Sequence, residues 1–194
     1  CMEERQATID GETKRLTSPF FVIATQNPVE TQGTFPLPEA QLDRFFVRLK
    51  VGYPSVAEGR EILDRFQKDS PFPSLECVAK QEEIVDAQQS FTAVNINNVL
   101  KDYIIEIIEA TRKHERVLLG VSPRGSLALM KASQAFAVIR GRDFVTPDDV
   151  KAVAPSVLAH RMVLKGHAIA SGAAAAENVI ADILKKVPVP VEEI

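Results

Sequence analysis

The sequence predicts a mixed fold, in which an α/β portion is followed by a helical domain. The dipeptide Asp10-Gly11 separates two short extended stretches, a pattern typical of a β-hairpin. The apolar run Phe20–Ala24 indicates a strand that is buried on both faces of a sheet. From Ser55 onward, apolar residues instead recur at helical spacing between capping signals. The two parts of the chain are therefore expected to differ in fold class.

The α/β portion is predicted to comprise residues 1–53. It begins with a hairpin over Gln6–Leu16, and Phe20–Ala24 is expected to be a central strand of a parallel sheet. A short helix is expected over Glu39–Arg44. Alternating apolar and basic residues over Phe45–Val51 predict one more strand.

The helical domain is predicted to comprise residues 54–194, with the joint near Tyr53–Ser55. Ser55 and Glu58 form a capping box, and the pairs Ser122-Pro123 and Thr146-Pro147 each place an N-cap residue before proline. These signals and the apolar spacing predict helices over about Ser55–Phe66, Gln81–Gln89 and Ala173–Val187. Three more helices are expected to start at Asn97 or Asn98, near Arg124 and near Asp148.

Composition excludes several classes of protein. With 45% apolar and 25% charged residues, a chain of 194 residues can bury a core without disulfides or metal. A net charge of −3 gives no general attraction to nucleic acid. Cys1 and Cys77 are too few for a disulfide framework, no metal-ligand spacing occurs, and the apolar run Ile169–Ala176 is too short to span a bilayer. A reducing, cytosolic setting without nucleic acid or resident metal is the expectation.

A phosphate-binding loop is missing from the sequence. No G-x-x-x-x-G-K-[S/T] motif occurs, and no apolar strand ends in the acidic pair that usually holds a phosphate-bound Mg²⁺. Any use of a nucleotide would therefore require groups that these residues do not supply.

Asn27 and Arg44 are two candidate functional residues. Asn27 follows a predicted strand at the edge of an α/β sheet, where it could orient a water molecule or simply form a turn before Pro28. Arg44 could project toward a nucleotide on a neighbouring subunit, or form a surface ion pair with little energetic effect.

Arg124 is the third candidate, because the Ser122-Pro123 pair places it in the first turn of a helix. A guanidinium group and a helix N-terminus both favour an anion, so this position predicts a phosphate contact; a neighbouring carboxylate is the alternative partner. The histidines are expected to be surface or packing residues, and His160-Arg161 to complement a helix C-terminus.

Several long motifs together resemble the MoxR family of AAA+ ATPases. They are Met2–Gln6, Thr8–Gly11, Phe21–Pro28, Leu37–Phe45, Ser122–Arg124, Thr146–Val150, His160-Arg161 and Val187–Pro190. The resemblance extends over essentially the whole chain. It implies the C-terminal edge of an α/β P-loop NTPase core, with a hairpin and parallel strands, followed by an all-α lid.

The resemblance also implies roles for individual residues. Asn27 would be the sensor 1 residue, and Arg124 the sensor 2 arginine that links the lid to ATP. Arg44 would be the arginine finger, acting on ATP of the adjacent subunit, and the hairpin Gln6–Leu16 would be a pore-facing pre-sensor insertion. The implied cofactors are ATP and Mg²⁺, and the implied partners are other copies in a hexameric ring, a client protein and a von Willebrand A domain protein.

The P-loop and the Mg²⁺-binding acidic pair of that family would lie upstream of Cys1. The sequence therefore resembles the C-terminal portion of an ATPase that remodels client proteins. The alternative is a helical interaction module that acts without nucleotide.

We predict that this 194-residue chain alone does not hydrolyse ATP, because it has neither the lysine of a P-loop nor the acidic Mg²⁺ ligands that hold the β- and γ-phosphates. Phosphate release measured with purified chain and MgATP should equal the buffer background. Turnover that co-purifies with the chain through two chromatographic steps would contradict this prediction.

Overall fold

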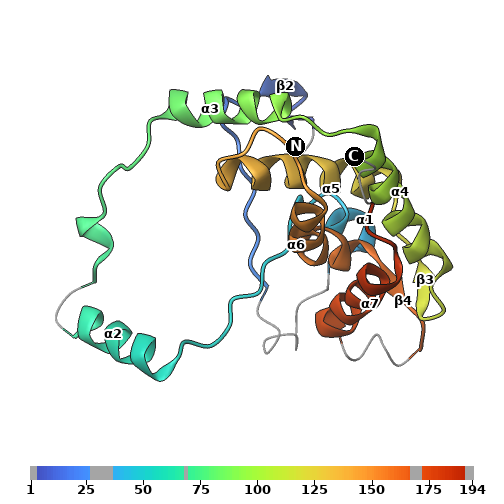
Figure 1. Ribbon diagram of the computed structural model, residues 1–194. Helices are drawn as coiled ribbons and strands as arrows, with labels where there is room; N and C mark the ends of the chain where they lie inside the picture. Colours follow the sequence, from blue (N-terminus) through green and yellow to red (C-terminus); the bar gives the residue numbers. More distant parts are fainter. Residues whose placement is uncertain (1–3, 27–36, 68–69, 167–171, 191–194) are drawn as a thin grey trace.

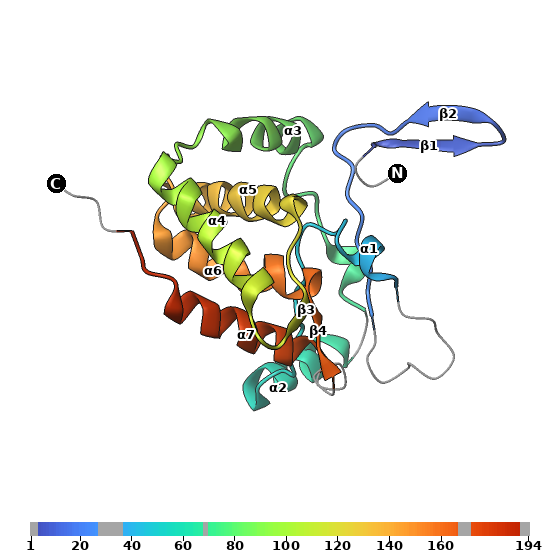
Figure 2. The ribbon, with the colours of Figure 1, turned by 90° about the vertical axis from the view of Figure 1, so that its right-hand side faces the viewer.

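The computed structural model describes residues 4–26, 37–67, 70–166 and 172–190. The chain begins with the predicted hairpin, in which strand β1 (Gln6–Ile9) pairs antiparallel with β2 (Glu12–Arg15). Asp10 and Gly11 both adopt positive φ, at 52° and 81°, which is the backbone that a two-residue hairpin turn requires. The hairpin projects away from the rest of the molecule (Figure 2).

Two predicted strands, Phe20–Ala24 and Phe45–Val51, are wrong for the described residues, because neither segment forms a strand there. A strand needs a neighbour to accept and donate its backbone hydrogen bonds, and no described segment pairs with either one. The side chains of Phe21 and Ile23 are 66% and 87% exposed. The apolar pattern is present, but the sheet that would bury it is absent from the described residues.

The helices begin close to the positions that the capping signals predict. Ser55 and Glu58 form the predicted capping box, with a 2.8 Å bond to the Ser55 amide, and Asn97 accepts from the Leu100 amide at 2.8 Å. The helices are α1 (Glu39–Leu42), α2 (Val56–Phe66), α3 (Gln81–Ser90), α4 (Asn98–Lys113), α5 (Pro123–Ile139), α6 (Pro147–Leu158) and α7 (Gly172–Lys186), with 3₁₀ turns η1 (Phe72–Ser74), η2 (Phe91–Ala93) and η3 (Ala159–Arg161).

The core lies between α4, α5, α6 and α7, which we call the helical body (Figure 1). Its largest fully buried side chains include Ile107, Leu129, Leu158 and Ile180, one from each helix. Burying a side chain of this size stabilises a fold by about 1.5–3 kcal/mol. The apolar stripes of these four helices therefore hold the body together.

A short antiparallel ladder lies within the helical body and was not anticipated from the sequence. Strand β3 (Val117–Leu119) pairs with β4 (Val163–Leu164), so the predicted all-α domain contains a small β element. Strands of two and three residues are too short to show an alternating pattern.

Helix α2 lies apart from the helical body (Figure 1). Its apolar residues Ile62, Leu63 and Phe66 are 46%, 73% and 52% exposed. Among the described helices, none has both the length and the apolarity that crossing a membrane requires.

Asp149 is a buried charge of the helical body that has several hydrogen-bond partners. It is 2% exposed, pairs with Arg142 through both carboxylate oxygens, and accepts the Thr146 amide at 2.8 Å to complete a capping box for α6. Burial alone would raise the pKa of Asp149, but the hydrogen bonds from Arg142 and Thr146 outweigh it and lower this pKa.

We predict that Asp149→Asn lowers the free energy of unfolding at pH 7 by about 3 kcal/mol, because it breaks a buried ion pair and a cap. Since the folded-state pKa is lowered, this stabilisation is present above the unfolded pKa of about 3.9 and is lost as the pH falls through the folded value. Urea unfolding at pH 7 and at decreasing pH should show the wild type converging on the variant. Asp148→Asn, which changes an exposed neighbour, is the matched control. If the wild type and Asp149→Asn differed by the same free energy of unfolding down to acid pH, the stabilisation could not be assigned to ionised Asp149.

Candidate functional site

Residues 43–49, which we call the connecting segment, follow α1 and lead toward α2. The last turn of α1 is continued by Asp43, whose amide donates to the Glu39 carbonyl at 2.9 Å, and the Arg44 amide donates to Gln41 at 3.2 Å. The Arg44 guanidinium then extends to Glu4 at the base of the hairpin, with Nη1 3.2 Å from Oε1. Arg44 is therefore displayed at the surface by a turn of helix.

Helix α5 brings its first turn against Asp43. Ser122 is the N-cap of α5, but its side chain does not cap the helix; the hydroxyl donates to Oδ2 of Asp43 at 3.2 Å. Arg124 Nη1 lies 3.4 Å from the same oxygen, and the Arg124 side chain is 42% exposed. The N-terminus of α5 and its arginine thus face a carboxylate of the connecting segment.

Arg161 of η3 holds the connecting segment from the other side. Its Nε lies 3.2 Å from Asp43 Oδ1, and its Nη2 and Nη1 donate to the carbonyls of Phe45 and Phe46 at 2.7 and 3.2 Å. It also donates to the Val157 carbonyl of α6, and its side chain is only 2% exposed. This buried guanidinium joins two backbone carbonyls and a carboxylate of the connecting segment to the helical body.

His160 adds another contact to the same segment. Its Nε2 lies 3.0 Å from the Phe45 carbonyl oxygen and 2.9 Å from Nη1 of Arg161, and the tautomer of the ring decides which of these two contacts is a hydrogen bond. Burial lowers the pKa of His160; Arg161 and Arg48 act in the same direction, whereas the Phe45 carbonyl and Asp43 oppose them. The neutral imidazole is therefore the favoured form of His160 in the folded chain.

Gly125 provides the space that Arg161 needs at the start of α5. A Cβ atom at this glycine would lie 3.2 Å from Cδ of Arg161 and 2.2 Å from Cγ1 of Val121. A larger residue would displace the side chain of Val121 and would crowd that of Arg161.

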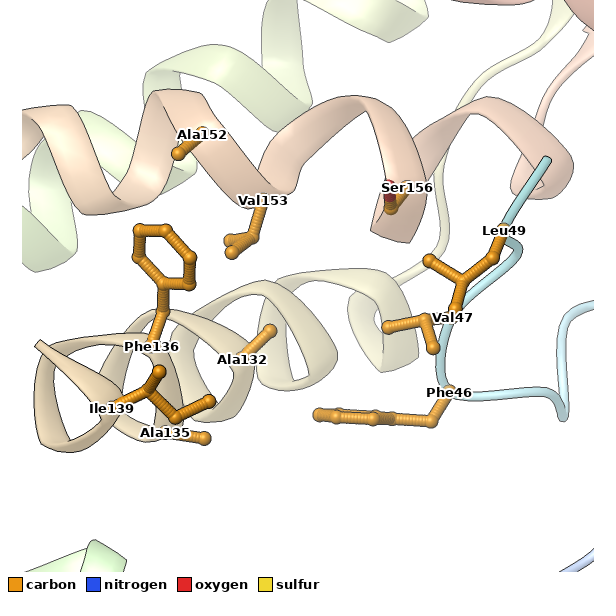
Figure 3. A pocket seen from close by; sticks show the side chains of 10 residues that line it. All are labelled: Phe46, Val47, Leu49, Ala132, Ala135, Phe136, Ile139, Ala152, Val153 and Ser156. Atoms are coloured by element: carbon orange, nitrogen blue, oxygen red, sulfur yellow. The ribbon is translucent and has the colours of Figure 1, made fainter. Parts of the chain in front are cut away.

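Apolar contacts continue the docking beyond Arg161. Phe46, Val47 and Leu49 line an apolar groove of about 370 Å³ together with residues of α5 and α6, among them Phe136 and Val153 (Figure 3). The Arg48 amide donates to the Ser156 carbonyl at 2.9 Å. Residues 45–49 therefore place backbone and apolar groups against the helical body, while Phe46, Val47 and Leu49 stay 47%, 40% and 75% exposed.

A cavity of about 640 Å³ opens beside Asp43. It combines charged groups with an apolar wall, and its lining is Glu39, Ala40, Asp43, Arg112, Leu118–Pro123 and His160–Val163. Arg112 fixes one side, because its Nε donates to the Val121 carbonyl at 3.0 Å. This geometry leaves an accessible space next to the N-terminus of α5.

The structure brings only part of the predicted site together. Arg124 contacts the carboxylate of Asp43, which is the alternative partner named above, and the guanidinium of Arg44 pairs with Glu4. Asn27 lies outside the described residues. No group of His, Cys, Asp and Glu residues suited to a metal occurs within the described ranges.

Asp43, His160 and Arg161 were missed as site residues. Sequence reasoning treated Asp43 as part of an exposed Asp-Arg pair and His160-Arg161 as a helix C-terminal complement. The histidine and arginine do follow α6, but their polar atoms reach the connecting segment. The only sequence signal was the presence of both motifs in the family pattern, because local spacing cannot pair residues so far apart in the chain.

Comparisons with known proteins agree with this layout. The profile described as "ATPase family associated with various cellular activities (AAA)" matches residues 1–47, and the AAA lid domain profile matches residues 109–183. Chaperone MoxR1 of Mycobacterium tuberculosis is 40% identical, over 97% of this chain and 52% of its own length. The chain belongs to the MoxR family of AAA+ ATPases.

Two further proteins are similar to nearly the whole chain. The uncharacterized protein YeaC of Bacillus subtilis is 49% identical over 99% of this chain and 60% of its own length. The crystal structure of a Cytophaga hutchinsonii protein described as an ATPase is 34% identical, with a TM-score of 0.88, over 98% of this chain and 60% of that one. The chain thus spans 52–60% of the length of these relatives. The predicted fold class, a P-loop core edge followed by a helical lid, is confirmed.

We predict that the free energy of unfolding falls as the pH is lowered from 7 to about 5, in part through His160. Because its folded-state pKa is lowered, the stabilisation by neutral His160 is present above the unfolded pKa of about 6.5 and is lost as the pH falls through the folded value. His160→Gln keeps an amide donor for the Phe45 carbonyl but does not titrate, so its loss of stability over this range should be smaller. His114→Gln, at the residue that follows α4, is the matched control. Identical pH profiles for the wild type and His160→Gln would show that His160 does not contribute.

Proposed function

We propose that this chain is the sensing and transactivating part of an ATPase that couples ATP hydrolysis to the remodelling or maturation of client protein complexes. The observation that carries the proposal is the meeting of Arg124, in the first turn of α5, with the connecting segment that bears Arg44. Arg124 of the lid thereby contacts the carboxylate of Asp43, the residue directly before the candidate arginine finger Arg44. Residues 1–53 would belong to the ATP-hydrolysing core and residues 54–194 to the lid.

Arg124 is the residue that would sense the nucleotide. Its guanidinium is partly exposed at the N-terminus of a 17-residue helix, where both the side chain and the helix dipole favour a phosphate. The donor set thus fits an ATP phosphate, with Arg124 as sensor 2. Asn27 would contribute the sensor 1 amide, which orients the attacking water.

Arg44 would act on the ATP of the adjacent subunit. Its side chain is 38% exposed, and its present partner is the similarly exposed Glu4, so a contact of this kind costs little to exchange. A guanidinium group that approaches the γ-phosphate stabilises the charge of the transition state. Arg44 would therefore be the arginine finger.

ATP with Mg²⁺ would supply the phosphoryl group that is transferred to water. Most of the groups that hold it would come from outside this chain, since the sequence contains no P-loop. Arg44 acting in trans requires a homo-oligomeric ring, which we propose to be hexameric and cytoplasmic. The hairpin β1–β2, which projects from the molecule, would face the client protein, and a von Willebrand A domain protein would be a further partner.

A helical interaction module without nucleotide is the second candidate function. The exposed apolar residues of α2, which lies apart from the helical body, favour it. Binding of a non-hydrolysable ATP analogue by the complete gene product distinguishes the two: the ATPase requires it, and the module does not.

We predict that Arg44→Ala in the complete gene product lowers ATP turnover by about 10³-fold and changes the affinity for ATP by less than about twofold. The reason is that a finger in trans stabilises the transition state more than the bound substrate. Turnover is measured by phosphate release, and affinity by calorimetry with AMP-PNP and Mg²⁺.

Two controls separate this role from a structural one. Glu4→Gln removes the ion pair of Arg44 but keeps the guanidinium, so turnover should be retained. Arg65→Ala removes an exposed arginine of α2 and should also have little effect. Unchanged turnover in Arg44→Ala would remove Arg44 from the finger role, and absence of AMP-PNP binding by the wild type would favour the interaction module.

A further inference from the structure

Asp43 uses both of its carboxylate oxygens on the helical body. Oδ2 accepts the Ser122 hydroxyl at 3.2 Å and lies 3.4 Å from Arg124 Nη1, while Oδ1 lies 3.2 Å from Arg161 Nε. Asp43 is directly followed by Arg44. A single residue therefore joins the candidate finger to two arginines of the lid.

The two arginines hold Asp43 with different strength. Arg161 is 2% exposed and is fixed by carbonyls of the connecting segment and of α6, whereas Arg124 is 42% exposed and lies at the longer distance. Water screens the outer pair much more than the buried one. Arg124 is thus the partner that Asp43 can give up, and Arg161 is the partner that it keeps.

The hydroxyl of Ser122 shows that Asp43 is held at the N-terminus of α5. As the N-cap residue, Ser122 would ordinarily accept a hydrogen bond from a first-turn amide, but its side chain makes no such bond here. It donates to Asp43 instead, which keeps Oδ2 beside Arg124. The carboxylate is therefore placed next to the arginine that would receive a phosphate.

We propose that Asp43 is an internal competitor for Arg124 and a positioning residue for Arg44. This inference rests on the proposed function, because the competing anion is a nucleotide phosphate. Without nucleotide, the Asp43 carboxylate neutralises Arg124. When a phosphate engages Arg124, Asp43 remains attached to Arg161, and the resulting movement of α5 relative to the connecting segment changes the position of the adjacent Arg44.

The test is Asp43→Asn in the complete gene product, with mant-AMP-PNP and Mg²⁺ as the probe. The amide has the shape of the carboxylate but no charge, so Arg124 no longer has to exchange an anionic partner for the phosphate. The dissociation constant of the probe should fall by roughly twofold to fivefold. Because Arg44 loses its link to the lid charges, kcat should fall while KM does not rise. A residue with a merely structural role would weaken binding instead.

A double-mutant cycle shows whether the effect passes through Arg124. In the background of Arg124→Ala, Asp43→Asn should leave the dissociation constant unchanged, since no sensor arginine remains to be released. Asp182→Asn, which removes an exposed lid ion pair with Arg116, is the matched control and should behave as the wild type.

Ser122→Ala serves if Asp43→Asn fails to fold. It removes the hydroxyl that holds Oδ2 and leaves both charges and the helix cap unchanged, so the probe should bind more tightly by a smaller factor. If the wild type binds the probe and Asp43→Asn binds it no more tightly, the inference is overturned but the proposed function is not. The same reading applies to Ser122→Ala if Asp43→Asn does not fold. Absence of binding by the wild type would overturn both.

Discussion

The contact between Arg161 and the connecting segment is the interaction on which the rest of the structure depends. A guanidinium that is 2% exposed must find acceptors, and Arg161 finds them in the carbonyls of Phe45, Phe46 and Val157, while Asp43 supplies the opposite charge. Removing one partner of a buried ion pair leaves an uncompensated charge, at a cost of about 3–5 kcal/mol. This cost fixes the path of the chain between its two parts.

Because that path is fixed, the N-terminus of α5 meets a carboxylate. The electropositive end of the helix, the Ser122 hydroxyl and the Arg124 guanidinium all point to Asp43, and a nearby cavity of about 640 Å³ leaves space for a ligand. The site therefore combines a buried anchor with a screened, exchangeable ion pair. In the proposed mechanism, such an arrangement transmits a change of partner at Arg124 to the position of Arg44, which follows Asp43.

The sequence predicted the local structure well where neighbouring residues decide it. The Asp10-Gly11 turn, the Ser55–Glu58 capping box and the Asn97 cap all lie where expected, because each depends on residues within one turn of the chain. It failed at Phe20–Ala24 and Phe45–Val51, whose extended pattern requires neighbouring strands to become a sheet. Side chains of the second segment line a groove with α5 and α6, as Figure 3 shows, and they remain partly exposed there.

The sequence by itself determined the family, the helix starts and the candidacy of Arg44 and Arg124, since motifs and caps are local. Only the tertiary structure decided which charges meet: Asp43 with Arg124 and Arg161, and Arg44 with Glu4. These partners are brought together by the packing of whole helices and by the burial of Arg161, and no spacing in the sequence encodes that. The candidate residues that the motifs indicate thus form a connected site only through the docking of the connecting segment on the helical body.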